Sequence, residues 1–142
     1  MLTTPAGWLL PLAVLAPFVG LLAGLALGAR AAQRVAMLAI PIGLGVAVGV
    51  AWTLWETGGP VVYVLGGWAP PLGVTLRADL LSAVMLVAVA GVVVGIAAYA
   101  RADFGMEPGK PEQRAPFVFW LLLLAVWGSL NLVFVSGDLF TL

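Results

Sequence analysis

Residues able to carry acid–base, redox or metal chemistry are scarce in this 142-residue sequence. It contains no Cys and no His, and six acidic and six basic side chains give a formal net charge of zero. The missing thiols and imidazoles exclude disulfides, thiolate metal sites and histidine catalysis. We therefore predict no catalytic, cofactor-binding or metal-binding residue on this chain. Whether a larger assembly containing it is an enzyme stays open.

Two acidic residues are weak candidates for an ion path. Asp79 stands at the predicted start of a membrane helix, where an acid can instead cap the helix. Asp138 follows the predicted end of another such helix. An ion path through lipid needs polar groups at depth, each of which costs ~2.5–3.5 kcal/mol to insert. The most polar side chains inside a span are Ser129 and Asn131, which we expect to bond across helices. A self-sufficient transporter is not indicated.

The elements that must position these residues are membrane helices. Hydrophobic residues make up 63% of the sequence and charged residues 8%, whereas a soluble domain has about 45–50% and about 25%. A soluble globule, a disordered chain and a nucleic-acid-binding protein are thereby excluded. Four charge-free stretches of roughly 20 residues can each cross a hydrocarbon core of ~30 Å as a helix. The absence of alternation argues against a β-barrel.

The fold predicted from these stretches is all-α and integral to the membrane. A single membrane domain, 1–142, would contain spans at about 8–28, 35–55, 80–100 and 116–135. The first is interpreted as a span rather than a cleaved signal, because no basic residue precedes it. Between the second and third spans, VVYVL and VTL flank GGWAPPLG and predict an extracytoplasmic β-hairpin at about 61–76. An irregular loop is the alternative.

Loop charges predict the orientation. The first and third connections hold Arg30, Arg34, Arg101, Lys110 and Arg114, whereas the second holds Arg77 alone. Because basic residues favour the cytoplasmic side, both chain termini and the hairpin are expected outside the cell (inner) membrane. Aromatic residues at the predicted span ends would be interfacial anchors, and Trp127, in mid-span, would pack against a neighbour. These anchors are Trp8, Trp52, Trp55, Tyr99 and Trp120.

Glycines at four-residue spacing predict close helix packing, because they let two backbones approach. Either a defined dimer motif or a general packing face in a larger bundle would explain them, and their presence in three helices favours the latter. They are Gly20, Gly24 and Gly28, then Gly45 and Gly49, then Gly91 and Gly95. Pro11, Pro17 and Pro41 should lie near helix starts or kink their helices modestly.

The sequence from Val61 onward resembles a known family. YVLGGWAPPLGVTLRADLLSAVMLVAVAGVVVGIAAY is similar to the N-terminal region of antiporter-like membrane subunits. These subunits occur in respiratory complex I, membrane-bound hydrogenases and multi-subunit Na⁺/H⁺ (Mrp-type) antiporters. FWLLLLAVWGSLNLVFVSGDLFTL resembles their fourth helix and the turn into the fifth. Within the family, the D-type subunits of the Mrp-type antiporters are the most similar.

The resemblance implies a bundle of about fourteen spans with inverted repeats of about five helices, whose early helices are scaffold. It implies ion-handling residues consisting of a glutamate in the fifth helix, a lysine in the seventh and further lysines or histidines later, none of which maps onto this sequence. Asp138 matches a recurrent acid of its segment rather than that glutamate. The apolar ending SGDLFTL is interpreted as a truncation or a split within a longer protein.

The functional hypothesis is therefore an N-terminal scaffold part of an antiporter-like subunit in a proton- or cation-translocating complex. Its parent would be a proton-pumping oxidoreductase or a pure antiporter. Expected partners are other integral membrane subunits, lipid and a second chain supplying the remaining helices. The alternative is a small non-transporting scaffold or assembly subunit of a membrane complex.

Overall fold

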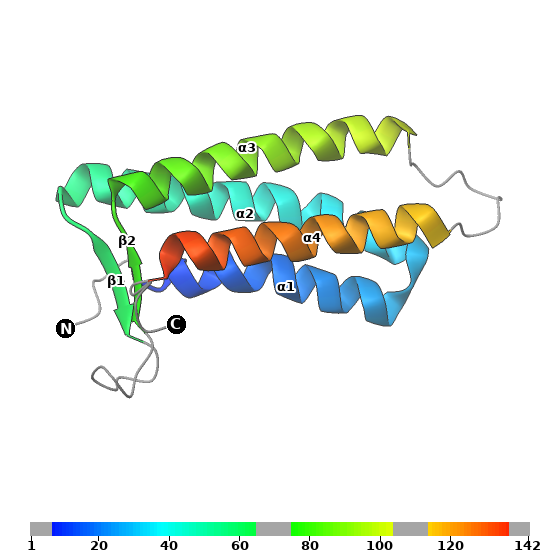
Figure 1. The fold of residues 1–142 in the computed structure, drawn as a ribbon, viewed down its shortest axis with the longest axis horizontal. Coiled ribbons are helices and arrows are strands. Elements are labelled where there is room, and N and C mark those ends of the chain that lie inside the picture. Colours follow the sequence, from blue (N-terminus) through cyan, green and yellow to red (C-terminus); the bar gives the residue numbers. More distant parts are fainter. Residues whose placement is uncertain (1–6, 65–74, 104–113, 137–142) are drawn as a thin grey trace.

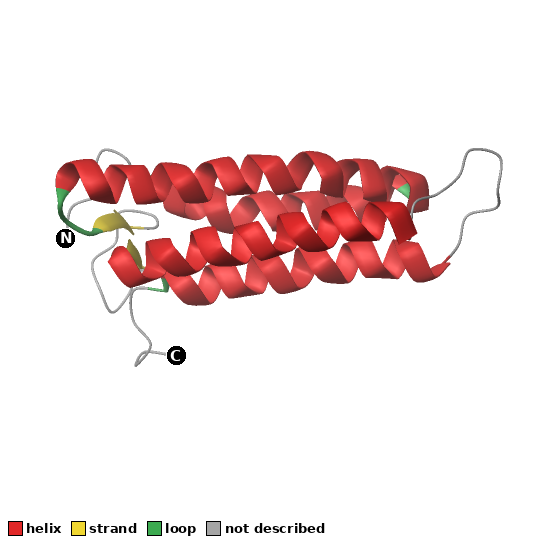
Figure 2. Ribbon diagram, turned by 90° about the horizontal axis from the view of Figure 1, so that it is seen from above, coloured by secondary structure: helices red, strands yellow, loops and turns green. Residues whose placement is uncertain are grey.

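Four long helices run side by side and antiparallel in the computed structural model, which describes residues 7–64, 75–103 and 114–136 (Figures 1 and 2). They are α1 (Leu9–Leu27), α2 (Ala29–Thr57), α3 (Leu80–Asp103) and α4 (Arg114–Val135). Each is long and apolar enough to cross a membrane. The chain is therefore mostly helical and has the character of a multi-pass membrane protein.

The four helices share one apolar core. α1 lies along both α2 and α4, while α3 packs mainly on α2 and has a smaller contact with α4. Small side chains make up much of the buried core on α2 and α3, including Ala36, Ala47, Ala90 and Ala97. Large apolar side chains cover the outside of all four helices. Such a surface suits lipid tails, which are as apolar as the helices themselves.

A single residue, Gly28, separates α1 from α2. Its φ of +98° is a conformation that side chains with a Cβ rarely adopt. Its N–H donates to the Gly24 carbonyl at 3.1 Å, and its own carbonyl accepts from Ala32 at 2.9 Å. The predicted connection 29–34 is thus helical, and Arg30 and Arg34 lie in the first turns of α2. Alanine, arginine and glutamine are good helix formers, so these residues can begin the helix directly after the turn.

A two-stranded antiparallel hairpin lies across one end of the bundle, where α1 begins and α4 ends (Figure 1). Its strands are β1 (Val61–Val64) and β2 (Thr75–Ala78), with Val61 opposite Ala78. The second strand therefore ends two residues beyond the predicted Leu76. Val61, Leu76 and Ala78 are buried in the shared core. Leu76 also forms an isolated antiparallel bridge with Ser136, which ties the end of α4 to the hairpin.

Most of the aromatic residues predicted at span ends are exposed, but one is not. Trp120 is fully buried in the bundle, so its interpretation as an interfacial anchor was wrong. It lies on the same face of α4 as Leu124, Trp127 and Asn131, all of which point into the core. Trp127 packs inside the bundle as predicted. The exposed aromatic residues are Trp8, Trp52, Trp55 and Tyr99.

Candidate functional site

A buried side-chain amide on α4 forms a hydrogen bond to α1, at a point where a proline removes one of the helical hydrogen bonds of α1. Pro17 lacks an N–H, so the Ala13 carbonyl four residues earlier loses its helical donor. The Asn131 Nδ2 donates to this carbonyl at 2.9 Å. Among the described residues, Asn131 is the buried polar side chain, with 3% of its surface exposed. The predicted bond across helices is therefore confirmed for Asn131.

Ser129 behaves differently from Asn131. It lies on the exposed side of α4, and its hydroxyl donates to the Ala125 carbonyl of its own helix at 2.8 Å. Among the described helices, none lies beside a serine that faces away from the bundle, so its hydroxyl donates to the carbonyl one turn earlier. The prediction of an interhelical bond was wrong for this residue.

The core face of α4 carries further polar atoms without partners. The Nε1 atoms of Trp120 and Trp127 and the Oδ1 of Asn131 are buried and have no hydrogen-bond partner among the described residues. Indole and amide groups do not titrate near neutral pH. This face can hold helices together by hydrogen bonds, but its side chains cannot take up and release protons.

Asp79 caps the N-terminus of α3. The backbone N–H of Ser82 donates to its Oδ1 at 2.8 Å, and the Ala83 N–H donates to its carbonyl at 2.9 Å. The hydrogen bond from the Ser82 backbone is the main reason that the pKa of Asp79 lies below its ordinary value, and the nearby Arg77 adds to this effect. Asp79 is exposed, at the end of a span rather than inside it. Asp138 lies outside the described residues.

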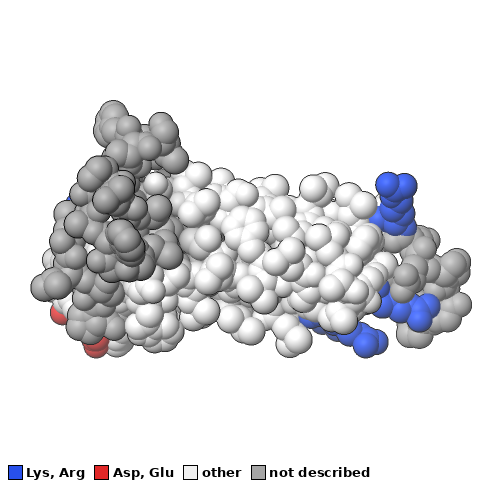
Figure 3. Space-filling view, turned by 90° about the horizontal axis from the view of Figure 1, so that it is seen from below, with Lys and Arg blue, Asp and Glu red and all other residues white. Residues whose placement is uncertain are grey.

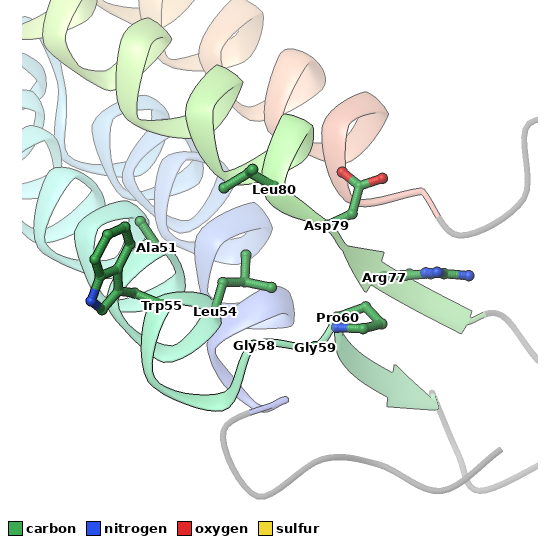
Figure 4. A pocket seen from close by; sticks show the side chains of 9 residues that line it. All are labelled: Ala51, Leu54, Trp55, Gly58, Gly59, Pro60, Arg77, Asp79 and Leu80. Atoms are coloured by element: carbon green, nitrogen blue, oxygen red, sulfur yellow. The ribbon is translucent and has the colours of Figure 1, made fainter.

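A pocket of about 400 Å³ opens beside Asp79. It lies between the end of α2, the hairpin and the start of α3 (Figure 4). In this view Trp55 stands on the α2 side, Arg77 and Asp79 stand on the hairpin side, and Leu54 and Leu80 lie between them. No local sequence pattern indicated this pocket, because its walls come from three separate elements.

The glycines predicted for packing fall into four groups. A Cβ at Gly20 would lie 3.2 Å from the Ala39 Cβ, and one at Gly24 would lie 3.3 Å from the Ala32 Cα, so α1 and α2 approach closely there. Gly28 makes the turn described above. Gly49 has only Leu9 nearby, at 3.6 Å. Three others have no described atom within 4 Å of a Cβ position, namely Gly45, Gly91 and Gly95.

Two further close contacts involve glycines that the four-residue spacing did not single out. A Cβ at Gly43 would overlap the Trp127 indole, with Cζ2 at 2.5 Å. One at Gly128 would lie 3.0 Å from the Phe18 ring. Both glycines face large aromatic side chains of another helix. The available signal was a mid-span Trp or Phe that needs a small residue opposite it.

The charged residues that the structure describes lie at the two ends of the bundle (Figure 3). The end with the Gly28 turn carries most of the described basic residues, and the hairpin end carries Glu56, Arg77 and Asp79. Between the ends the visible surface bears no charge (Figure 3). Among the described residues, no group of three His, Cys, Asp or Glu could hold a metal ion. The described charged residues at the end with the Gly28 turn are Arg30, Arg34, Arg101, Asp103 and Arg114.

Comparison with known proteins connects the chain to a cation/proton antiporter. Over 84 residues, 59% of this chain, the sequence is 36% identical to the D-type component of a probable K(+)/H(+) antiporter from Rhizobium meliloti (strain 1021). This chain is similar to part of an antiporter subunit. The aligned stretch is only 14% of the length of that relative. No family model matches the sequence.

The similarity agrees with the antiporter-like resemblance seen in the sequence. It does not extend to the expected cation, because the name of the relative specifies K⁺ where the sequence resemblance suggested Na⁺. It is also silent on any connection to respiratory complex I.

Proposed function

We propose that this chain is an N-terminal helical scaffold of an antiporter-like subunit within a multi-subunit membrane complex that exchanges cations for protons. The similarity to an antiporter subunit supports the kind of complex. The scaffold role is supported by one observation in particular. The buried face of the described helices carries no ionisable side chain, and its one polar residue, Asn131, is engaged with the Ala13 carbonyl.

The absence of a titratable group at depth limits what the described helices can do. Moving a proton or cation through lipid requires groups that change charge or coordinate the ion along the way. The carbonyl that Pro17 frees in α1 has its donor in Asn131. Translocated charge must therefore pass through other helices of the complex, supplied by the rest of the subunit or by a partner chain.

The proposed orientation places the hairpin outside the cell membrane. Four of the five described arginines lie at the opposite end, which the positive-inside rule assigns to the cytoplasm. α1 would then begin outside and α4 would end outside. The exposed aromatic residues Trp8, Trp52 and Trp55 would lie at the outer headgroup level.

Exchange measurements test the scaffold role. The purified chain in vesicles with an internal pH dye should show no K⁺- or Na⁺-driven pH change beyond that of empty vesicles. Membrane vesicles from cells lacking the gene should lose cation/proton exchange, and both the wild-type gene and one encoding Asp79→Asn should restore it. A cation-driven pH change from the purified chain would overturn the proposal. A deletion that slows assembly but leaves full exchange in the assembled complex would favour the assembly-subunit alternative.

Cysteine labelling tests the orientation. Because the sequence contains no cysteine, only the introduced cysteine of each variant can react. Glu56→Cys lies at the hairpin end and Ala102→Cys at the other, both at exposed positions. In intact cells a membrane-impermeant maleimide should label only the first variant, and in inverted vesicles only the second. The reverse pattern would place the hairpin in the cytoplasm.

A further inference from the structure

The pocket at the hairpin end has two walls of different chemistry. Leu54 and the exposed faces of Trp55 and Leu80, which are 85% and 71% exposed, form the apolar wall. Arg77 and Asp79 form the charged wall. The pocket lies where α2 ends and α3 begins, so in a membrane it sits where hydrocarbon gives way to headgroups. A ligand with an apolar part and a charged part fits such a place.

The charged wall offers one cation and one anion, which are two residues apart in the sequence. Arg77 lies in β2 and Asp79 directly follows the strand, so their Cα atoms are roughly 6–7 Å apart. Both residues line the pocket, and Figure 4 shows their side chains extending in different directions from it. The hydrogen bond from the Ser82 backbone keeps Asp79 ionised, because it lowers the pKa of the carboxyl. Both charges are therefore available at neutral pH.

We propose that this pocket binds a zwitterionic phospholipid whose headgroup carries a phosphate and a primary ammonium. The phosphate would face Arg77, the ammonium would face Asp79, and an acyl chain would lie along Trp55 and Leu80.

Charge complementarity favours this lipid over others. Among the described residues at this end, Arg77 is the basic side chain, and Glu56 and Asp79 are both acidic. A purely anionic headgroup would find one attractive group and two repulsive ones. A headgroup with both charges can satisfy Arg77 and Asp79 together, and the ammonium can donate hydrogen bonds to a carboxylate. The apolar wall adds an interaction that a soluble phosphate compound cannot use.

Lipid binding to the full chain in detergent tests the proposal, by native mass spectrometry with short-chain phosphatidylethanolamine and phosphatidylglycerol. The wild type should prefer phosphatidylethanolamine. Arg77→Gln should weaken binding of both lipids about two- to fivefold, the range expected for a solvent-exposed ion pair. Asp79→Asn should weaken only phosphatidylethanolamine and so abolish the preference. Asn is as good an N-cap as Asp, so this variant keeps α3 capped.

Arg101→Gln is the matched control, because it removes an exposed arginine from the other end of the bundle. Its preference between the two lipids should equal that of the wild type. Equal wild-type affinity for the two lipids would overturn the proposal, as would an unchanged preference in Asp79→Asn. Binding of phosphoethanolamine as tightly as the whole lipid would also overturn it, because the ligand would then be soluble and the apolar wall irrelevant.

Discussion

The bond between Asn131 and the Ala13 carbonyl makes a quantitative prediction about how α1 and α4 are held together. Replacing Asn131 with leucine, which is similar in size, removes the donor and leaves the carbonyl without a partner, because Pro17 cannot supply one. The replacement Pro17→Ala restores a backbone N–H four residues after Ala13, where it can donate to that carbonyl. The two changes should therefore be coupled through the single oxygen atom of Ala13.

The expected cost of Asn131→Leu follows from the environment of that atom. Hydrogen bonds between membrane helices contribute about 0.6 kcal/mol on average and about 1.7 at most. An orphaned buried carbonyl adds to the loss, at about 1–3 kcal/mol. The replacement also removes the buried Asn131 Oδ1, which lacks a described partner, and this offsets part of the loss in stability. The net loss should be about 1–2 kcal/mol, or a five- to thirtyfold change in the unfolding equilibrium constant.

The double-mutant cycle separates this bond from the other effects of each change. In the Pro17→Ala background the cost of Asn131→Leu should fall below about 0.5 kcal/mol, because the new N–H satisfies the carbonyl. The energetic cost of the cavity left by the buried proline is present with and without Asn131→Leu, so it cancels in the cycle. The measurement is the free energy of unfolding in mixed micelles titrated with sodium dodecyl sulfate, followed by tryptophan fluorescence.

The control for this cycle is Ser129→Ala, on the exposed side of the same helix, which should change stability by less than about 0.5 kcal/mol. An equal cost of Asn131→Leu in both backgrounds would refute the reasoning. It would mean that Asn131 acts through packing rather than through the carbonyl that Pro17 leaves free.

Two further predictions concern single positions. Gly43→Ala should destabilise the bundle by about 1–3 kcal/mol, because the new methyl overlaps the Trp127 indole, and Trp127→Leu should suppress that cost. Gly45→Ala, two residues on with open space around it, should be neutral or stabilising because alanine favours helix; equal losses at both sites in the same unfolding assay would contradict the contact. Asp79→Ala should cost about 1 kcal/mol through loss of the cap, whereas Asp79→Asn should cost little. Since the folded-state pKa of Asp79 is lowered, its added stability is complete above the ordinary value of 3.8 and is lost as the pH falls toward the lowered pKa. Unfolding measured between pH 6 and pH 3 should show this loss in the wild type and not in Asp79→Asn, and a parallel decline in both would contradict it.

The number of spans and the hairpin could be predicted because they depend on local composition. A charge-free run of about 20 residues has few alternatives in lipid, and β-branched residues around glycine and proline favour a turn between strands. The start of α2 was not predicted, because Arg30 and Arg34 were assigned to a loop on account of their charge. Charge marks the membrane boundary, whereas the helix continues for as long as the backbone finds its hydrogen bonds.

The contacts inside the bundle were only partly predictable, because they depend on which helix faces which. The polarity of Asn131 was visible in the sequence, but its partner was not, since a freed carbonyl is a property of Pro17 on another helix. Regular spacing drew attention to Gly91 and Gly95, where a Cβ would have no described atom within 4 Å, and missed Gly43. The pocket needed the register of β2 and the ends of two helices, which no local pattern specifies.

The one-residue reversal at Gly28 has a consequence for biosynthesis. Since no hydrophilic tether links the first two spans, we expect the insertion machinery to release α1 and α2 into lipid together, as a preassembled helical pair. In the proposed orientation such a pair carries Arg30 and Arg34 at its trailing, cytoplasmic tip, so neither guanidinium has to cross hydrocarbon.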